Sequence, residues 1–256
     1  MAVNSGKFVW YDQMSHDMNA SAAFYKNVVG WSVVANTMND SPYTILAAGE
    51  TTIGGVMPIP EEAAKGGVKP AWMGYIGVDN VDAYADKVKA AGGAIHRPPT
   101  DIPNVGRFAV ASDPTGAGFI LFKGQGEAAP AHDYAKPGHV GWRELNAGDR
   151  ETAFAFYSRL FGWTKGVPFD MGPMGIYQLF DIDGQSAGGI MTKTAQAPVP
   201  HWLFYFNVDG ADAAAARVKA NGGEVRNGPH QVPTGQWVLQ ALDSQGALFG
   251  LLAPVR

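Results

Sequence analysis

GWRELNAGDRETAFAFYSRLFGW, residues 141–163, decides the fold of this chain, because a close copy of the stretch occurs earlier in the sequence. The copy is FVWYDQMSHDMNASAAFYKNVVGW, residues 8–31. Trp10 aligns with Trp142, and the same separation of 132 positions continues to the end of the copy. A repeat of this length predicts two structurally equivalent halves before any residue is given a chemical role.

Each copy predicts a strand, a turn and an amphipathic helix. Residues 8–14 alternate bulky and smaller groups, which is typical of a strand. Asp17 is placed to cap a helix at its start, and Gly30 is placed to end it in the left-handed conformation. The aligned residues Asp149 and Gly162 predict the same boundaries for the second helix.

A second pattern follows each copy within its own half of the chain. Residues 72–78 and 202–208 are predicted strands, and each precedes a helix that stops at a pair of glycines, Gly92-Gly93 or Gly222-Gly223. Short strand candidates complete every pattern. We therefore expect the order strand-helix-strand-strand-strand four times, twice in each half.

Two domains are expected from this organisation, covering residues 1–124 and 139–256. The stretch between them, residues 125–138, is rich in Gly, Ala and Pro and lacks periodicity, which is typical of a linker. The segment PIPEEAAKGGVKP, residues 58–70, is predicted to be a loop for the same reason of composition.

The composition indicates a globular chain and argues against several function classes. The chain has 256 residues, of which 46% are apolar and 16% charged, and its net charge is −4. There is no basic stripe, so no nucleic-acid partner is expected. The absence of cysteine excludes thiolate metal sites and a cysteine nucleophile. Neither a signal peptide nor a membrane-spanning run is apparent, so we expect a cytoplasmic protein without a membrane partner.

The ordered landmarks together resemble the vicinal oxygen chelate superfamily, which includes glyoxalase I, bleomycin-resistance proteins and extradiol dioxygenases. The likeness rests on motifs that recur in order: AFYKNVVGW at 23–31, AFYSRLFGW at 155–163, VDNVDAYADKVKAAGG at 78–93, VDGADAAAARVKANGG at 208–223 and SDPTGAGFILF at 112–122. The resemblance implies an α+β fold of two tandem domains. Each domain is then two βαβββ units that form a half-open barrel of mixed or antiparallel strands around a pocket, with helices outside.

The resemblance also implies positions for a divalent metal, on four strands of each domain. In this chain those positions fall near Trp10, Gly55, Met73 and Ile120 in the first half, and near Trp142, Gly189, Leu203 and Gly250 in the second. None of these residues is a metal ligand, so no metal and no other cofactor is predicted at them. A divalent metal elsewhere is kept as an alternative, with Glu144 and His201 as candidate ligands.

Asp12 and Glu144 are the candidate catalytic residues. Each lies two positions beyond the aligned tryptophan and therefore on the same face of its strand. A carboxylate in a pocket accepts a hydrogen bond from a substrate hydroxyl or amine, or acts as a general base if burial raises its pKa. The alternative is a structural carboxylate bonded to the backbone or to a tyrosine.

Six further residues are candidates for ligand binding. Aromatic rings at the inner positions favour a planar ligand, Arg107 suits an anionic group at a pocket mouth, and His201 precedes a strand of the second domain. The alternatives are rings that fill the barrels, a surface arginine and core tyrosines; the other histidines, including His16, are given no role. These six candidates are Trp10, Tyr75, Arg107, Trp142, His201 and Tyr205.

Two function classes follow. The first is metal-independent binding or sequestration of a small molecule, as in the bleomycin-resistance branch. The second is a glyoxalase-type lyase or a dioxygenase that uses a relocated metal or carboxylate acid/base catalysis. The chain could also form a homodimer, because family members pair such units within or between chains.

Overall fold

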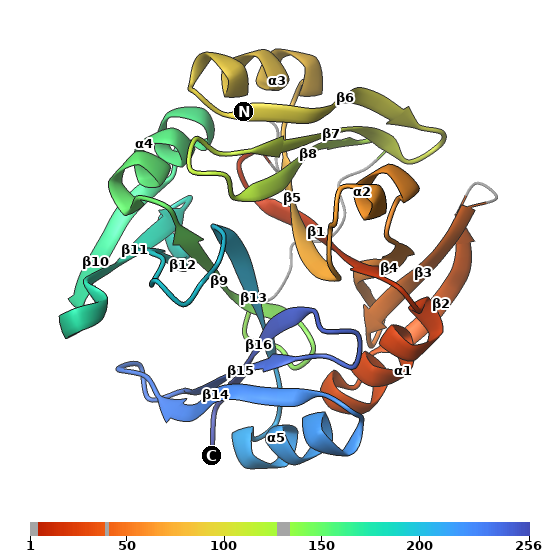
Figure 1. Ribbon diagram of the computed structural model, residues 1–256, viewed down its shortest axis with the longest axis vertical. Helices are drawn as coiled ribbons and strands as arrows, with labels where there is room; N and C mark the ends of the chain where they lie inside the picture. Colours follow the sequence, from red (N-terminus) through yellow and green to blue (C-terminus); the bar gives the residue numbers. More distant parts are fainter. Residues whose placement is uncertain (1–4, 39–40, 127–133) are drawn as a thin grey trace. The chain divides into compact units, whose positions relative to one another are not determined.

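The fold was analysed in a computed structural model, which describes residues 5–38, 41–126 and 134–256 (Figure 1). The first half contains, in chain order, β1 (Phe8–Ser15), α1 (Met18–Val29), β2 (Ser32–Met38), β3 (Ser41–Ala48), β4 (Thr51–Pro58), α2 (Glu61–Lys65), β5 (Ala71–Gly77), α3 (Val81–Ala90), β6 (Ala94–Ile102), β7 (Gly106–Ser112) and β8 (Gly118–Gly124). The second half contains β9 (Val140–Ala147), α4 (Arg150–Phe161), β10 (Thr164–Asp170), η1 (Gly172–Met174), β11 (Ile176–Ile182), β12 (Gln185–Thr192), β13 (His201–Asn207), α5 (Ala211–Ala220), β14 (Glu224–Gln231), β15 (Trp237–Leu242) and β16 (Leu248–Ala253).

Each half of the chain supplies one mixed eight-stranded sheet. The strand orders are β2-β3-β4-β1-β5-β8-β7-β6 and β10-β11-β12-β9-β13-β16-β15-β14, and they are the same order of equivalent strands. Each strand-helix-strand-strand-strand pattern forms one module of four strands. The first strand of a module pairs in parallel with the last, as β1 with β4, β5 with β8, β9 with β12 and β13 with β16. The other neighbours within a module are antiparallel. The predicted α+β class and the fourfold strand-helix-strand-strand-strand order are confirmed.

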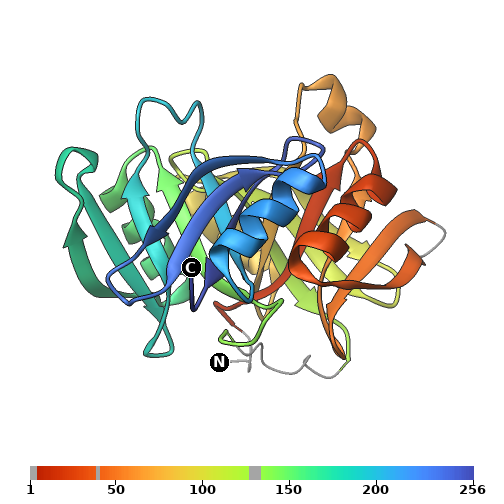
Figure 2. The ribbon, with the colours of Figure 1, turned by 90° about the horizontal axis from the view of Figure 1, so that it is seen from below.

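The described residues group into two compact units, and each unit takes one module from each half. Unit 1 holds residues 5–10, 73–126 and 143–202; unit 2 holds residues 11–38, 41–72, 134–142 and 203–256. Helix α3 lies against α4 in unit 1, and α1 lies against α5 in unit 2, where Figure 2 shows the two helices side by side. The division into domains 1–124 and 139–256 stays a prediction about the sequence halves, and residues 127–133 of the predicted linker lie outside the described residues.

The helices begin and end where the sequence predicts. The Asp17 carboxylate accepts a hydrogen bond from the Ala20 backbone N–H, and Asp149 accepts one from Thr152, so both helices have side-chain N-caps. Gly30 and Gly162 end them with φ values of 91° and 75°, in the left-handed region that favours glycine.

Each unit is joined internally by a buried chain of hydrogen bonds between its two modules. In unit 2 the Trp72 indole donates to the Tyr25 hydroxyl at 2.7 Å, and this hydroxyl donates to Asp243 at 2.8 Å. In unit 1, Trp202 donates to Tyr157, which donates to Asp113. Because the Tyr and the Asp come from opposite halves of the chain, each of these bonds links a module of the first half to a module of the second half.

Two tryptophans hold the segments that lead into the first strand of each half. The Trp163 indole donates to the Gly6 carbonyl at 2.7 Å, and the Trp31 indole donates to the Gly138 carbonyl at 2.7 Å. Both rings are almost fully buried. Because the two tryptophans are equivalent in the repeat, each half of the chain holds the segment that leads into the first strand of the other half.

The structure differs from the sequence-based expectation at three elements. Helix α2 lies within residues 58–70, for which the composition predicts a loop, and no residue range was predicted for strands β10 and β14. Strands β10 and β14 are the two edges of their sheet. An edge strand is half exposed and has no apolar alternation to detect, and both strands contain proline. No helix in the described residues is long and apolar enough to cross a bilayer.

Candidate functional site

The first candidate carboxylate, Asp12 in unit 2, is paired with a tyrosine that lies two strands away in the same sheet. Asp12 lies in β1 and is 2% exposed. The hydroxyl of Tyr43, in β3, donates to Asp12 Oδ1 at 2.5 Å. A short hydrogen bond to a buried carboxylate is of the charge-assisted kind and fixes the positions of both groups.

The glycines of β4 make this pairing possible. A Cβ atom on Gly55 would lie 2.2 Å from the Tyr43 Cζ atom, so the ring passes directly over the Gly55 backbone. A Cβ atom on Gly54 would lie 2.1 Å from the carbonyl oxygen of Tyr11 on β1. The glycine pair therefore provides room for a tyrosine ring on one face and for close strand pairing on the other.

The second candidate carboxylate, Glu144 in unit 1, is also bonded to a tyrosine, and in addition to an asparagine of its own strand. Tyr177, in β11, donates its hydroxyl to Glu144 Oε2 at 3.2 Å. Asn146, two residues further along β9, donates its amide to Glu144 Oε1 at 3.0 Å. A Cβ atom on Gly189 would lie 2.1 Å from the Tyr177 ring, so this ring also lies over a glycine.

The two copies differ in ways that bear on ligand access. Glu144 is 8% exposed, and both Tyr177 and Asn146 are partly exposed, whereas Asp12 and Tyr43 are buried. The position equivalent to Asn146 in the first half is Met14, which offers no amide. The second copy is thus the more accessible and the more polar of the two.

The aromatic candidates of the second half form an apolar surface in unit 2. Trp142 is half-buried and packs against a cluster that contains Leu203, Tyr205 and Leu252. The Tyr205 ring lies over Gly250, where a Cβ atom would be 2.3 Å from Cδ1 of the ring. Its hydroxyl accepts a hydrogen bond of 2.7 Å from Gln240 Nε2. This tyrosine therefore has the polar partner that a buried phenol requires.

The aromatic candidates of the first half are placed less distinctively. Tyr75 is buried in β5, and its ring packs edge-on against Phe122 at 5.7 Å between centroids. Trp10 is half-buried in β1. Both remain candidates for ligand contact only on the sequence argument.

Arg107 and His201 have partners other than the candidate carboxylates. The Arg107 guanidinium makes two bonds of 2.8 Å to Asp82 and one of 2.9 Å to Asp101. These ion pairs raise the pKa of Arg107 and lower that of Asp82. His201 Nδ1 lies 3.0 Å from the Val199 carbonyl oxygen. An anionic ligand would have to compete with two carboxylates for Arg107.

The metal positions that the resemblance implies do not fit a metal in this chain. Gly189 and Gly250 are covered by tyrosine rings, Leu203 is part of an apolar cluster, and Trp142 packs against that cluster. Within the described ranges, no group of three or more His, Cys, Asp or Glu side chains is arranged to hold a metal ion. We therefore derive no chemical step through a metal at these positions.

A buried carboxylate outside the sheet faces, Asp243, was missed from the sequence. Burial raises its pKa, although hydrogen bonds from Ala247, Tyr25 and Gln245 act in the opposite direction. Burial also raises the pKa of the Tyr25 hydroxyl, as does the charge of the adjacent Asp243. Gln13 donates to Asp243 at 3.0 Å, and its own Oε1 atom has no hydrogen-bond partner within the described residues.

Tyr43 and Tyr177 were also missed, although the sequence holds a signal for them. Each tyrosine precedes the second glycine of its Gly-Gly pair by the same 12 positions, at Gly55 and Gly189. A glycine within a strand indicates the close approach of another group, and the aligned tyrosines identify that group. The repeat alone would have been sufficient to propose both pairs.

Comparison with known proteins identifies the class to which this fold and these sites belong. The family model of the Glyoxalase/Bleomycin resistance protein/Dioxygenase superfamily matches residues 7–121 and again residues 136–251. The chain belongs to this superfamily, whose members bind small molecules. The two matches correspond to the two halves that the repeat predicts.

Curated relatives resemble the chain over nearly its whole length. "Putative glyoxylase CFP32" of Mycobacterium tuberculosis is 32% identical over 96% of this chain and 94% of its own length. "Anthracycline biosynthesis protein DauV" of Streptomyces sp. strain C5 is 32% identical over 96% of this chain and 93% of its own length.

Solved structures share the fold at low sequence identity. The Mn(II)-bound glyoxalase from Novosphingobium aromaticivorans aligns with a TM-score of 0.67 at 15% identity, covering 99% of this chain and 83% of that protein. The 2,3-dioxygenase LapB from Pseudomonas sp. KL28 aligns with a TM-score of 0.64 at 11% identity, covering 95% and 90%. At this identity the likeness describes the fold alone.

Proposed function

We propose that this protein binds a small planar molecule that carries hydroxyl groups, and that Glu144 is the polar anchor for that molecule. One observation supports the proposal above the others. Two residues beyond Trp142, where the resemblance implies a metal ligand, strand β9 presents a carboxylate held by Tyr177 and Asn146, and glycine stands at the implied position 189. A carboxylate held in position is an acceptor suited to a ligand hydroxyl or amine.

The second copy is the better candidate because its carboxylate can be reached. Glu144 keeps more exposed surface than Asp12, and Tyr177 is only partly buried. Asp12 is almost fully enclosed and makes a shorter bond to Tyr43. We assign Asp12 a structural role, in which the same pair stabilises the first half.

The planar class of ligand follows from the names of two relatives. The relatives named for anthracycline biosynthesis support a polycyclic hydroxylated ligand for this chain as well.

An enzymatic role is the second candidate, and the geometry of Glu144 favours it in one respect. A carboxylate with little exposure, bonded to a phenol, is placed to accept a proton from a ligand hydroxyl. The activity would then be of the lyase or dioxygenase type. It would be distinguished from binding by a rate that is lost in Glu144→Gln while ligand affinity is retained.

Calorimetric titration of an anthracycline and of a simple catechol tests the proposal. The protein is first treated with a chelator, and its metal content is measured by elemental mass spectrometry. We expect binding to persist, to weaken by about tenfold or more in Glu144→Gln, and to weaken less in Tyr177→Phe. Asp12→Asn is the matched control, with affinity expected within about twofold of the wild type. Equal affinity in Glu144→Gln and the wild type would refute the proposal.

A further inference from the structure

A cavity lies in unit 2, beside the first turn of α1. Its volume is about 410 Å³. Three apolar side chains, Met18, Pro42 and Pro58, form part of its wall. The complete lining is His16, Asp17, Met18, Asn19, Pro42, Thr44 and Pro58.

Thr44 presents a buried polar group to this cavity. Successive residues of a strand face opposite sides, so Thr44 projects away from the side on which Tyr43 reaches Asp12. The residue is only 4% exposed, yet it lines the cavity. Its hydroxyl makes no hydrogen bond to any other residue that the structure describes. This hydroxyl can therefore donate a hydrogen bond to a group that enters the cavity.

The first turn of α1 presents two further donors. In residues 5–38, 41–126 and 134–256, the backbone N–H groups of Met18 and Asn19 have no acceptor. Asp17 caps the following N–H group, that of Ala20, at 3.0 Å. The free amides of a helix start carry partial positive charge and favour an anion.

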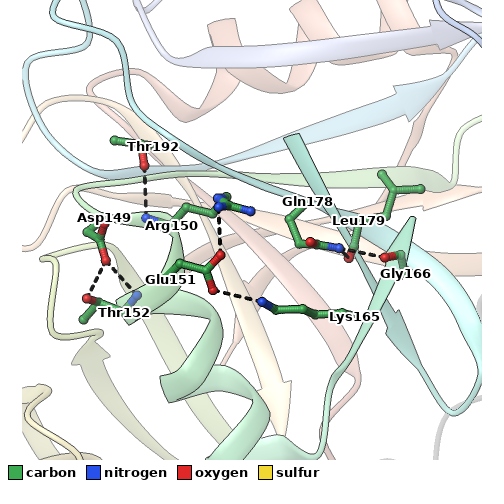
Figure 3. A network of polar contacts seen from close by, with 9 residues as sticks. All are labelled: Asp149, Arg150, Glu151, Thr152, Lys165, Gly166, Gln178, Leu179 and Thr192. Atoms are coloured by element: carbon green, nitrogen blue, oxygen red, sulfur yellow. Dashed lines mark hydrogen bonds and ion pairs between the residues drawn. The ribbon is translucent and has the colours of Figure 1, made fainter. Parts of the chain in front are cut away.

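At the equivalent place in unit 1 the polar groups bond to other groups of the chain, as Figure 3 shows. There the Arg150 N–H donates to the Thr192 hydroxyl at 3.1 Å, and Glu151 supplies a carboxylate in the first turn of α4. Glu151 is bonded to Arg150 at 2.7 Å and to Lys165 at 2.9 Å. The buried Gln178, which is equivalent to Thr44, donates to two backbone carbonyls.

The first copy has lost each of these internal groups. Pro58 stands at the position of Thr192 and offers no hydroxyl, and Asn19 stands at the position of Glu151. The first turn of α1 accordingly contains no acidic residue, whereas that of α4 contains Glu151. Met18 therefore has no counterpart of the Thr192 hydroxyl, and the start of α1 has no carboxylate at position 19.

We propose that this cavity binds a small organic carboxylate. The carboxylate group accepts hydrogen bonds from the Met18 and Asn19 N–H groups and from the Thr44 hydroxyl, and so supplies Met18 with the acceptor that Arg150 finds in Thr192. The organic part lies against Pro42 and Pro58. Asp17 is the one acidic side chain of the lining, and its cap to Ala20 engages one of its oxygens.

Backbone amide resonances give a direct test, with sodium benzoate as the probe and benzamide as its uncharged match. In two-dimensional NMR spectra of the full ¹⁵N-labelled chain, we expect saturable benzoate shifts at Met18 and Asn19. Benzamide should bind at least about tenfold more weakly than benzoate, because it lacks the negative charge. The absence of saturable shifts at these two amides would overturn the proposal, as would equal affinity for the two probes.

Variants that copy the second half of the chain sharpen the test. Asn19→Glu supplies the missing carboxylate and should weaken benzoate binding by about tenfold or more, whereas Asn19→Gln should retain it. Thr44→Val should also weaken it. Glu144→Gln and Glu151→Gln should leave the shifts unchanged, so a failure of the Glu144 proposal stays separable from a failure here. Undiminished binding in Asn19→Glu would refute the carboxylate site.

Discussion

The ring of Tyr177 lies directly over Gly189, so closely that a Cβ atom on the glycine would be 2.1 Å from the ring. The same relationship joins Tyr43 to Gly55 in the first half, at 2.2 Å. Each ring crosses its glycine to reach a carboxylate on the neighbouring parallel strand. Glycine at a position where the superfamily resemblance implies a metal ligand is therefore explained by a tyrosine–carboxylate pair.

Replacement of either glycine should disturb the pair that crosses it. We expect Gly189→Ala and Gly55→Ala each to lower the free energy of unfolding by about 1–3 kcal/mol, because the ring must move. Urea denaturation measures the change. Gly124→Ala is the control, since its nearest neighbour would be at an ordinary 3.4 Å.

A double variant shows whether the ring is the cause. In Tyr177→Ala the space over Gly189 is open, so adding Gly189→Ala to it should cost little. The coupling free energy between the two substitutions then equals most of the cost of Gly189→Ala alone. Additive effects would show that the glycine is required for another reason.

The two tyrosine hydroxyls should differ in their contribution to stability. Tyr43→Phe removes a 2.5 Å bond to a buried carboxylate, and we expect a loss of about 2 kcal/mol or more. Tyr177→Phe removes a 3.2 Å bond at a more exposed carboxylate that keeps Asn146, and the expected loss is about 1 kcal/mol or less. Chemical denaturation of both variants checks the order, and a larger loss in Tyr177→Phe would contradict it.

Most of the fold could be predicted from the repeat, but only part of the candidate site could be predicted from it. Caps at Asp17 and Gly30 are local effects, so a single sequence reveals them. The pairing of Tyr177 with Glu144 depends on strand register, which brings together residues far apart in the chain. Composition and periodicity do not encode that register, although the matched spacing from each tyrosine to its glycine does.

The sequence gives even less indication of which modules from opposite halves form one unit. Tyr25 and Asp243 belong to motifs that the sequence displays clearly, the AFY helix and the turn before the last strand. Their contact joins the first module to the fourth, and nothing in either motif specifies its partner. The same holds for Trp31, whose bond to the Gly138 carbonyl depends on the tertiary arrangement.

Asp243 should make stability depend on pH. Burial raises its pKa in the folded protein above the ordinary value of 3.8, so the folded state binds a proton more tightly than the unfolded state does. The contribution of Asp243 to the free energy of unfolding is therefore largest below the ordinary pKa and decreases as pH rises through the raised one.

Comparison with Asp243→Asn isolates this contribution. We expect the wild type to lose stability relative to the variant as pH rises from about 4 to about 7, as followed by urea midpoints. The variant should fold, because Gln13 can turn its amide and offer Oε1 to the new side-chain amide. A stability difference that does not change with pH would contradict the assignment.

The two entry tryptophans should have comparable effects on stability. In Trp31→Phe or Trp163→Phe a backbone carbonyl loses its buried donor, and part of the indole volume is lost as well. We expect each substitution to lower the free energy of unfolding by about 2–4 kcal/mol. Trp237→Phe is the control, because this partly exposed ring contacts a terminal arginine, and its expected cost is below about 1 kcal/mol.

The central claim is that Glu144 anchors a planar hydroxylated ligand without a metal at the superfamily positions. Calorimetric titration of an anthracycline into chelator-treated protein, repeated with Glu144→Gln and Asp12→Asn, tests it most directly. We expect binding in the wild type, an affinity at least about tenfold lower in Glu144→Gln, and little change of affinity in Asp12→Asn. Binding that appears only after a divalent metal is added, or that is unchanged in Glu144→Gln, would contradict it.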